Sequence, residues 1–474
     1  MTNYLDLSLE QIHNKLKKKL IKPIDLVNEA FEKIEKEDYN AFITLCKKDA
    51  IQKAIELENK EVDNLFFGIP ITVKDIFCTK GVKTTCGSKM LENFVPIYDA
   101  TVIKFIKDAN MIIIGKTNMD EFAMGASGET SYFGATKNPF DLNYITGGSS
   151  SGSAATVSSK ISSISIGTDT GGSVRQPASY TGCVGMKPTY GRISRYGVIA
   201  YASSLDHVGI FSNNVKDNAH MLNLLSKDCY NDLTKFETNE DFTLELEKSK
   251  KFKIAVPNFF VGDIVDEKIK NSINKIINLL KENNYSIDYI DMPYLNHSVT
   301  LYQIISMGEA SSNLARFDGI KYGFKPENVT NLNELIKETR SNGFGEEVKM
   351  RLMIGAYILS SENAHIYYEK ALKLRGTIIN SFNKVFEEYD LIIGPVTASM
   401  PSKIGDNDGN PIKSFYDDLF TIPANLCGLP AISLPINKNQ FPIGLQIIGN
   451  KYKENDVYNL AHFIETLVKG GAND

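Results

Sequence analysis

The sequence predicts an α/β fold, in which helices cover a β-sheet on both faces. Short apolar segments of strand length alternate with amphipathic segments of helix length from residue 66 onwards. Glycine is also unevenly distributed, since 14 of the 34 glycines lie between residues 115 and 197, where an even distribution would place about six. The chain has 474 residues, 42% of them hydrophobic, which is enough for a large buried core. We therefore expect one large domain with backbone-dominated chemistry in its glycine-rich part.

The first sixty residues are predicted to be helical. Ser8 and Gln11 have the spacing of a capping box, and Pro23 suits the first turn of a second helix. From residue 66 the pattern changes to predicted strands at residues 69–73, 111–114 and 161–166, with an amphipathic helix at residues 101–109.

The second half of the chain is predicted to be mostly helical before it returns to strands. A strand is expected at residues 252–256, and helices dominate from about residue 298 to residue 388. Strands follow at residues 391–394, 431–434 and 445–448. We expect a single domain over residues 1–474, composed of N-terminal helices (1–60), a Gly/Ser-rich catalytic core (61–210), a mostly helical insertion (250–390) and a return to the core (391–474).

Composition excludes several classes of protein. The 52 basic and 57 acidic residues give a net charge of −5, so the chain lacks the excess of positive charge that binding nucleic acid by itself would require. No apolar run exceeds five residues, which predicts no membrane span. The six cysteines include no C-x-x-C pair, so we expect reduced thiols, no zinc or other metal site, and a cytoplasmic location.

Three segments of the core have the residue types of a nucleophilic site. Residues 68–75 (GIPITVKD) place Lys74 at the end of a predicted strand. Residues 147–153 (GGSSSGS) and 167–175 (GTDTGGSVR) are glycine- and serine-rich, and the second begins where a strand ends. Successive glycines allow consecutive backbone N–H groups to converge on one point, as an oxyanion hole requires. If Lys74 is buried, lowering its pKa from about 10.4 to 7 corresponds to about 4.6 kcal/mol.

Other interpretations of these segments exist. Lys74 alone could be a surface cation, and a single Gly/Ser loop could be a flexible connection. Residues 148–152 also match G-x-S-x-G, which would make Ser150 the nucleophile with His207 or His365 as its base. Residues 115–117 (GKT) look like the end of a phosphate-binding loop, but the required earlier glycine is Asn110, so we reject that interpretation.

Together, the three segments resemble the Ser–cis-Ser–Lys triad of the amidase signature family. The resemblance implies the amidase-signature fold, with a central mixed β-sheet covered by helices on both faces and a helical insertion. It also implies that Ser173 is the nucleophile, that Ser149 relays protons beside a cis peptide bond, and that Lys74 is the base. The oxyanion donors would be the backbone N–H groups of Thr170, Gly171 and Gly172. Arg175 is expected to be a structural anchor.

Further segments are similar to the A subunits of glutamyl-tRNA(Gln) amidotransferases. They are residues 117–125 (TNMDEFAMG), 309–319 (EASSNLARFDG), 345–349 (GEEVK) with Arg351, and 418–430 (DLFTIPANLCGLP). This resemblance implies hydrolysis of glutamine and passage of ammonia to a B subunit, which amidates Glu-tRNA(Gln) using ATP and Mg. A small C subunit would complete a heterotrimer, and the glutamine-hydrolysing chain itself would need no cofactor.

The same resemblance implies residues that recognise glutamine. Arg351 would clamp the α-carboxylate, Asp418 would pair with the α-ammonium group, and Tyr302 and Ser127 would add polar contacts. The simpler alternatives are an ion pair of Arg351 with Glu346 or Glu347, and a capping role for Asp418. The sequence departs from the family's commonest form at Ser151 and at residues 126–128.

Two other functions remain open on the sequence alone. A stand-alone amidase for small, aryl or fatty-acid amides would share the triad but would not need the residues that bind the charged groups of glutamine. A catalytically silent scaffold or nucleotide-binding module is disfavoured because all three triad positions are intact. The sequence leaves open whether Asp-tRNA(Asn) is also a substrate of the complex.

Overall fold

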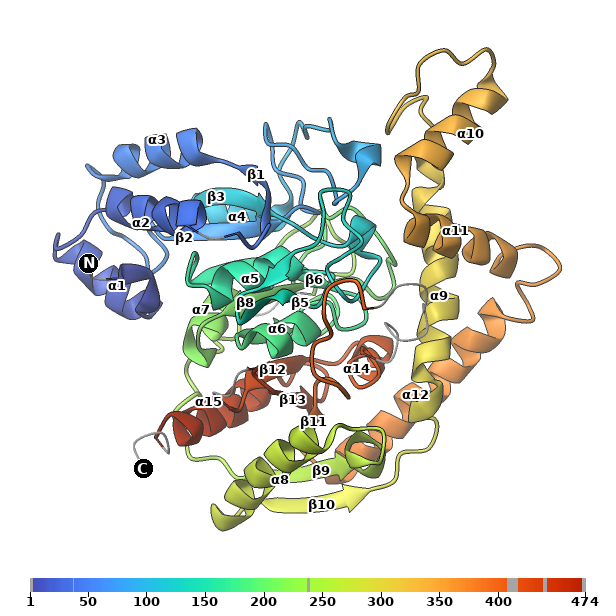
Figure 1. Cartoon of the computed structure of the whole chain (residues 1–474). Helices are drawn as coiled ribbons and strands as arrows, with labels where there is room; N and C mark the ends of the chain where they lie inside the picture. The colour runs from blue at the N-terminus through green and yellow to red at the C-terminus, as the bar shows by residue number, and fades with distance from the viewer. Residues whose placement is uncertain (1–2, 37, 237–238, 407–416, 438–440, 471–474) are drawn as a thin grey trace.

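The computed structural model describes residues 3–36, 38–236, 239–406, 417–437 and 441–470. Its central feature is one eleven-stranded sheet, which confirms the predicted fold class (Figure 1). The strands are β1 (Phe42–Leu45), β2 (Pro70–Lys74), β3 (Ile112–Thr117), β6 (Ile164–Asp169), β7 (Val184–Lys187), β8 (His207–Ser212), β9 (Lys253–Pro257), β10 (Ser286–Ile290), β11 (Leu391–Pro395), β12 (Ala431–Pro435) and β13 (Gly444–Gly449). A separate two-stranded sheet pairs β4 (Lys137–Asn138) with β5 (Asp141–Ile145).

The large sheet is mixed, with the order β1-β3-β2-β6-β8-β7-β12-β13-β11-β9-β10. The part that carries the predicted site residues is parallel, because β2 pairs in parallel with both β3 and β6. On the other side of β6, neighbouring strands are antiparallel from β8 to β11, and β11, β9 and β10 are again parallel to one another. The ends of β2 and β6 therefore lie side by side, which brings the residues that follow them together at one edge of the sheet.

Helices flank the sheet and extend beyond it. They are α1 (Leu9–Lys17), α2 (Pro23–Lys36), α3 (Lys47–Leu57), α4 (Thr101–Asp108), α5 (Ser151–Ser158), α6 (Arg175–Thr181), α7 (Val215–Leu225), α8 (Glu267–Glu282), α9 (Ser298–Asn313), α10 (Leu332–Gly343), α11 (Glu346–Ile358), α12 (Tyr368–Glu388), α14 (Ile422–Cys427) and α15 (Glu454–Gly470). Short 3-10 helices lie at Tyr4–Asp6, Lys89–Leu91, Glu121–Ala123, Asn258–Val261, Leu295–His297 and Leu314–Arg316. The predicted capping box of Ser8 and Gln11 and the N-terminal proline of α2 are confirmed.

Two hydrophobic clusters show that the sheet is covered on both faces. Phe211 of β8 packs with apolar residues of α5 and α6 in a small cluster. The adjacent residue, Ile210, belongs to the main core, which includes residues of α7 and α15. Because successive side chains of a strand point to opposite faces, the two clusters lie on opposite sides of the sheet.

Two predictions about segments were wrong in detail. The first sixty residues are not wholly helical, since β1 pairs antiparallel with β3. This four-residue edge strand is too short for its alternation to stand out between two helical patterns. The segment at residues 250–390, expected to be mostly helical, also contributes β9 and β10 to the far edge of the main sheet. The predicted strand at residues 161–166 begins later and runs through Asp169.

Four helices, α9 to α12, stand together along one side of the molecule, and we call them the helical arm (Figure 1). Helix α9 packs against α11, α12 and α14, so the arm is joined to the segment that follows residue 417. Among the described residues, no helix has the length and apolarity needed to cross a membrane. All six cysteines are free thiols.

Candidate active site

Lys74 lies at the end of β2 and is fully buried. Its Nζ atom lies 2.7 Å from Ser149 Oγ, 2.9 Å from Ser150 Oγ and 2.9 Å from Thr168 Oγ1. All three partners are neutral hydroxyl groups. Burial lowers the pKa of Lys74 from 10.5 to about 7, although more distant carboxylates oppose the shift. A large fraction of the amine is therefore neutral at physiological pH.

The hydroxyl groups around Lys74 orient its lone pair. Ser150 Oγ donates its hydrogen to the carbonyl oxygen of Thr168 at 3.1 Å, so towards Lys74 it can only accept. When Ser150 and Thr168 accept the two N–H groups of the neutral amine, its lone pair is left for the hydroxyl hydrogen of Ser149. This arrangement suits a general base that takes a proton from Ser149.

The loop that carries Ser149 is fixed on both sides. The peptide bond between Gly148 and Ser149 is cis. Gln176 holds this loop, because its Oε1 accepts from Gly148 N at 2.9 Å and its Nε2 donates to the carbonyl oxygen of Ala126 at 2.7 Å. A side chain at Gly148 would clash with Asp120, since a Cβ would lie 1.9 Å from its Oδ2. Only glycine fits at this point in the loop.

Ser173 lies in the turn between β6 and α6 and is 3% exposed. Its carbonyl oxygen accepts from Ser150 N at 3.2 Å, which joins the two serine loops. Gly172 has φ +153°, a conformation that favours glycine. Within the described residues, the N–H groups of the three predicted oxyanion donors, Thr170, Gly171 and Gly172, and that of Ser173 donate no hydrogen bond in the chain. These N–H groups are available to stabilise an oxyanion.

Two predicted substrate residues, Tyr302 and Asp418, border this glycine turn. A Cβ on Gly171 would lie 2.8 Å from Tyr302 Cζ, and one on Gly172 would lie 2.4 Å from Asp418 Oδ1. Asp418 is buried, and its Oδ1 has no hydrogen-bond partner among the described residues. Burial and the nearby Asp169 carboxylate raise the pKa of Asp418 well above its usual range. A bound cation would remove this penalty.

Arg351 lies on the inner face of α11 and is buried. Its Nη1 donates to the hydroxyl of Tyr201 at 2.9 Å, and its Nη2 lies 2.7 Å from Glu347 Oε1. The expected alternative, an ion pair with Glu347, is thus present, while Glu346 lies fully exposed beside Lys349. The pair still lies close to the other predicted substrate residues, since the Arg351 charge opposes the rise that burial causes in the pKa values of Tyr302 and Asp418.

Ser127 is the predicted site residue with the weakest connection to the others. It is 8% exposed, and its Oγ accepts from Glu129 N within its own turn. Its neighbour Ala126 is tied through Gln176 to the serine loop. The structure therefore places Ser127 near the triad loop without a direct bond to it, and its role stays a prediction.

The structure excludes the competing motif interpretations. Ser150 bonds to Lys74 and Thr168, whereas His365 is exposed and His207 Nδ1 lies 2.5 Å from the carbonyl oxygen of Leu205. No histidine in the described part of the chain serves Ser150 as a base. Lys116, in the segment similar to a phosphate-binding loop, lies 3.3 Å from Asp75 in the core.

Arg175 has the anchoring role that the sequence predicted. Its guanidinium lies 2.9 Å from Asp169 Oδ1 and also donates to Gln446 and to the carbonyl oxygen of Thr421. These bonds join the catalytic turn to β13 and to the segment that begins at residue 417. Burial raises the pKa of Asp169, but the charge and hydrogen bond of Arg175, together with Lys187 and Asn425, hold this pKa below its usual range.

Sequence reasoning missed several residues of the site. Thr168 contacts Lys74, Tyr201 contacts Arg351, and Asp206 accepts at 2.8 Å from the side chain of Thr170, whose backbone N–H was a predicted oxyanion donor. Strand alternation could not have found Thr168, because Val73 pairs with Ile166 and alternation would therefore place Thr168 on the face opposite to Lys74. No sequence motif identifies Tyr201, which is 150 residues from Arg351 along the chain. Across the described ranges, no group of three or more His, Cys, Asp or Glu side chains could hold a metal ion.

Comparisons with known proteins agree with this geometry. The family model described as Amidase matches residues 25–458. The chain is 47% identical over 468 residues to the A subunit of glutamyl-tRNA(Gln) amidotransferase from Staphylococcus epidermidis, covering 97% of this chain and 96% of that protein. It is 47% identical over 473 residues to the corresponding protein of Pediococcus pentosaceus, covering 98% and 97% of the two chains.

Solved structures give the same result for the fold. The crystal structure of the glutamyl-tRNA(Gln) amidotransferase A subunit from Thermotoga maritima has a TM-score of 0.81 and 38% identity, covering 97% of this chain and 94% of that chain. A bacterial aryl acylamidase has a TM-score of 0.86 at 23% identity, covering 97% and 96% of the two chains, which is a likeness of fold alone.

Proposed function

This chain belongs to the amidase family, and from that premise we propose that it is the glutamine-hydrolysing A subunit of a glutamyl-tRNA(Gln) amidotransferase. The proposal rests on one observation. Lys74, whose hydrogen-bond partners are all neutral, has its Nζ 2.7 Å from Ser149 Oγ, in a site that also holds Arg351 and Asp418. The first pair provides amide hydrolysis, and the second pair matches the two charges of free glutamine.

Acylation follows from the relay. Ser173 Oγ attacks the carboxamide carbon of glutamine while its proton passes to Ser149, and the proton of Ser149 passes to Lys74. The carbonyl oxygen becomes an oxyanion, which the N–H groups at residues 170–173 stabilise. Lys74 then returns a proton through Ser149 to the leaving nitrogen. The C–N bond breaks, ammonia leaves, and a glutamyl ester remains on Ser173.

Deacylation repeats the relay with water as the nucleophile. Water gives a proton to Lys74 through Ser149 as it attacks the ester carbon, and the proton returns to Ser173 as the ester bond breaks. The net reaction converts glutamine and water into glutamate and ammonia. Lysine and serine end in their starting protonation states, so one neutral amine supports both half-reactions.

Recognition of glutamine rests on two buried charges. The Arg351 guanidinium can bind the α-carboxylate in a bidentate manner, in exchange for part of its pairing with Glu347. Asp418 Oδ1, which lacks a partner among the described residues, can accept from the α-ammonium group. Tyr302, against the glycine turn, and Ser127 would provide further polar contacts.

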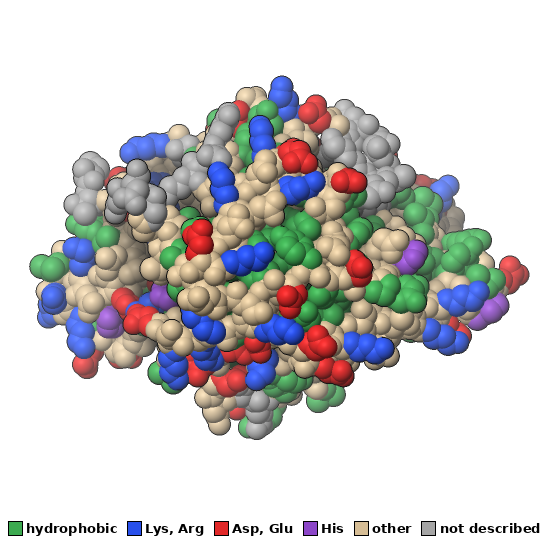
Figure 2. All heavy atoms as spheres, turned by 90° about the horizontal axis from the view of Figure 1, so that it is seen from below, with side chains coloured by type: hydrophobic (Ala, Val, Ile, Leu, Met, Phe, Trp, Pro, Cys, Tyr) green, Lys and Arg blue, Asp and Glu red, His purple; other side chains and the backbone are tan. Residues whose placement is uncertain are grey.

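The ammonia has to reach a second site. In the proposed complex, a B subunit uses ATP and Mg to activate Glu-tRNA(Gln) and amidates it with this ammonia, and a C subunit joins the two. The face seen in Figure 2 carries interspersed acidic and basic side chains, and the chain's net charge is −5. We therefore expect the partner subunits to hold most of the tRNA, and the complex to act in the cytoplasm.

The proposal is tested with the chain expressed together with its genomic neighbours. We expect B- and C-like subunits to copurify with it, and the complex to release ammonia from glutamine. Ser173→Ala should lower this release by about 10⁴-fold or more, while Ser151→Ala, in the neighbouring loop, should change it only a few-fold. A monomeric chain that hydrolyses simple amides well, and whose glutamine turnover is unaffected by Arg351→Ala, would show the alternative, a stand-alone amidase.

A further inference from the structure

Residues 120–122 contact both halves of the site, the triad and the helical arm. At one end, the backbone N–H of Asp120 donates to the carbonyl oxygen of Ser149 at 3.2 Å. The Asp120 carboxylate accepts from Gly128 N at 3.0 Å and from Thr130 N at 3.1 Å. This end of the segment is therefore fixed to the loop that carries the relay serine.

The next side chain, Glu121, reaches the helical arm instead. It is 2% exposed, and its Oε2 accepts from Gly345 N at 2.8 Å. Its Oε1 accepts from Ser88 Oγ at 2.5 Å. Gly345 directly precedes α11 and has no side chain that could cap this helix. The Glu121 carboxylate thus caps α11 from 224 residues away, at the end of the helix where negative charge is favoured.

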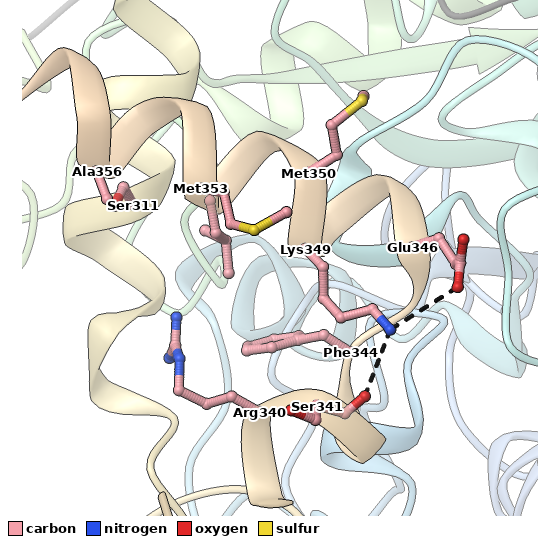
Figure 3. Close-up of a pocket in the computed structure, with 10 residues that line it drawn as sticks. Ser311, Arg340, Ser341, Phe344, Glu346, Lys349, Met350, Met353 and Ala356 are labelled. Atoms are coloured by element: carbon pink, nitrogen blue, oxygen red, sulfur yellow. Dashed lines mark hydrogen bonds and ion pairs between the residues drawn. The ribbon is translucent and has the colours of Figure 1, made fainter. Parts of the chain in front are cut away.

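Aromatic packing reinforces this junction. The Phe122 ring contacts Phe344 and Phe317, with centroids 5.6 Å and 5.3 Å apart. Figure 3 shows Phe344 beside the first turns of α11, where Lys349 bonds to Ser341 and Glu346. Phe122 has φ +49°, an uncommon value for a non-glycine residue. The surrounding contacts retain this conformation, which turns Glu121 and Phe122 towards the arm.

We propose that Glu121 is a positioning residue for glutamine binding, which holds the N-terminus of α11 against the Ser149 loop and so sets the position of Arg351 relative to Ser173. Arg351 lies six residues after Gly345, which is about 9 Å along a helix. A small shift at the start of α11 would therefore displace the guanidinium. Misplacement by about 1 Å can cost about a hundredfold in rate. This inference rests on the proposed function.

The test uses the complete complex and glutamine as substrate. Burial raises the pKa of Glu121 to about 7, so assays at pH 8 keep its carboxylate ionised. We expect Glu121→Ala to raise KM for glutamine about tenfold while kcat changes less than about threefold, because the triad keeps its geometry. A small alkyl fluorophosphonate, which has no carboxylate for Arg351, should label Ser173 at the wild-type rate.

Two variants serve as controls. Glu121→Gln keeps an oxygen that can accept from Gly345 N, and it should bring KM back to within about threefold of the wild-type value. Glu346→Ala removes a carboxylate from the first turn of the same helix, where the side chain is fully exposed. It should leave KM unchanged, because Glu346 does not reach the core.

A double-mutant cycle separates positioning from a general structural role. If Glu121 acts through Arg351, Glu121→Ala should change kcat/KM less than about twofold in an Arg351→Ala background. Additive losses, slower labelling of Ser173, or an unchanged KM in Glu121→Ala would overturn the inference. A wild-type complex that is labelled at Ser173 but hydrolyses no glutamine would instead overturn the proposed function, and this inference with it.

Discussion

Lys74 and Lys116 lie on adjacent strands of one sheet and are both fully buried, yet they have different partners. Lys116 lies 3.3 Å from Asp75 Oδ1 and donates to the carbonyl oxygen of Phe77 at 2.8 Å. Lys74 is surrounded by hydroxyl groups. Asp75 directly follows Lys74, but successive side chains along a strand point to opposite faces, so its carboxylate serves Lys116. Both lysines are buried, so the difference in their partners makes Lys74 suitable as a base and Lys116 a structural cation.

The same contrast recurs among the other buried charges of the site. Arg175 and Asp169 are paired with each other and with neighbouring polar groups. Asp418 Oδ1 has no hydrogen-bond partner in the described part of the chain. Because an unpaired buried charge is costly, it persists where a reaction or a substrate uses it. The Arg175–Asp169 pair holds this part of the fold together, whereas Asp418, without a partner for its Oδ1 among the described residues, marks the site.

The largest expected effect separates the two lysines directly. Lys74→Ala should lower kcat for glutamine hydrolysis about 10⁴-fold or more, because no other group can take the proton of Ser149. Lys116→Ala should instead lower the free energy of unfolding by about 3–5 kcal/mol, because it leaves Asp75 buried and unpaired. Denaturant unfolding and ammonia release measure the two effects. A large loss of stability in Lys74→Ala, or of kcat in folded Lys116→Ala, would contradict the comparison.

The unpaired carboxylate should matter for glutamine more than its neighbour does. Asp418→Asn removes the charge that faces the α-ammonium group, and we expect kcat/KM for glutamine to fall about a hundredfold, equivalent to about 3 kcal/mol. Asp417→Asn is the matched control, because Asp417 bonds to Ser399 and Tyr180 instead. Equal losses in the two variants would show that Asp418 has no special role in binding.

The protonation of Lys74 should determine the acidic limb of the pH profile. Because the base must be neutral and its pKa is about 7, lowering the pH protonates Lys74 and removes activity. We expect kcat/KM for glutamine to fall about tenfold per pH unit below 7 and to level off above it. Glu121 also has a pKa of about 7, so its titration would fall in the same pH range. Glu121→Gln removes that titration, and we expect this variant to keep the acidic limb. A profile that is flat down to pH 5.5 would mean that Lys74 is not the base.

The smallest effect concerns the orientation of the lysine. Thr168→Val removes one of the three hydroxyl groups around Lys74, and we expect kcat to fall about tenfold because the lone pair is less well directed. Thr72→Val is a suitable control, because Thr72 lies on the same strand as Lys74 but bonds to Thr156. Steady-state kinetics should show no more than a twofold change in that control.

The triad could be predicted because each of its members lies in a short segment with its own glycine and serine pattern. The partners of those residues could not, since Thr168 carries no motif and Tyr201 reaches Arg351 only through the fold. Ser150 is an instructive case. The sequence allowed it to be a nucleophile, and the structure makes it an acceptor for Lys74 and a donor to Thr168.

The fold was predictable where local signals were strong. Ser8 and Gln11 form the expected cap, and β2 and α4 lie where apolar spacing placed them. The short edge strand β1 was missed, and the membership of β9 and β10 in the main sheet was not anticipated. Strand pairing joins residues far apart in the chain, so periodicity within one segment cannot reveal it.

The sequence by itself determined the elements whose physics is local, which are the glycine turns, the serine loops and the lysine at the end of β2. Tertiary structure alone decided which of the buried charges would find a partner, because that depends on which strand faces and helix ends the fold brings together. The Asp75 carboxylate pairs with Lys116, so the hydrogen-bond partners of Lys74 among the described residues are hydroxyl groups. Glu121, in the catalytic core, accepts a hydrogen bond from the residue that precedes α11. These contacts span up to 224 residues, a separation at which no local pattern predicts a contact.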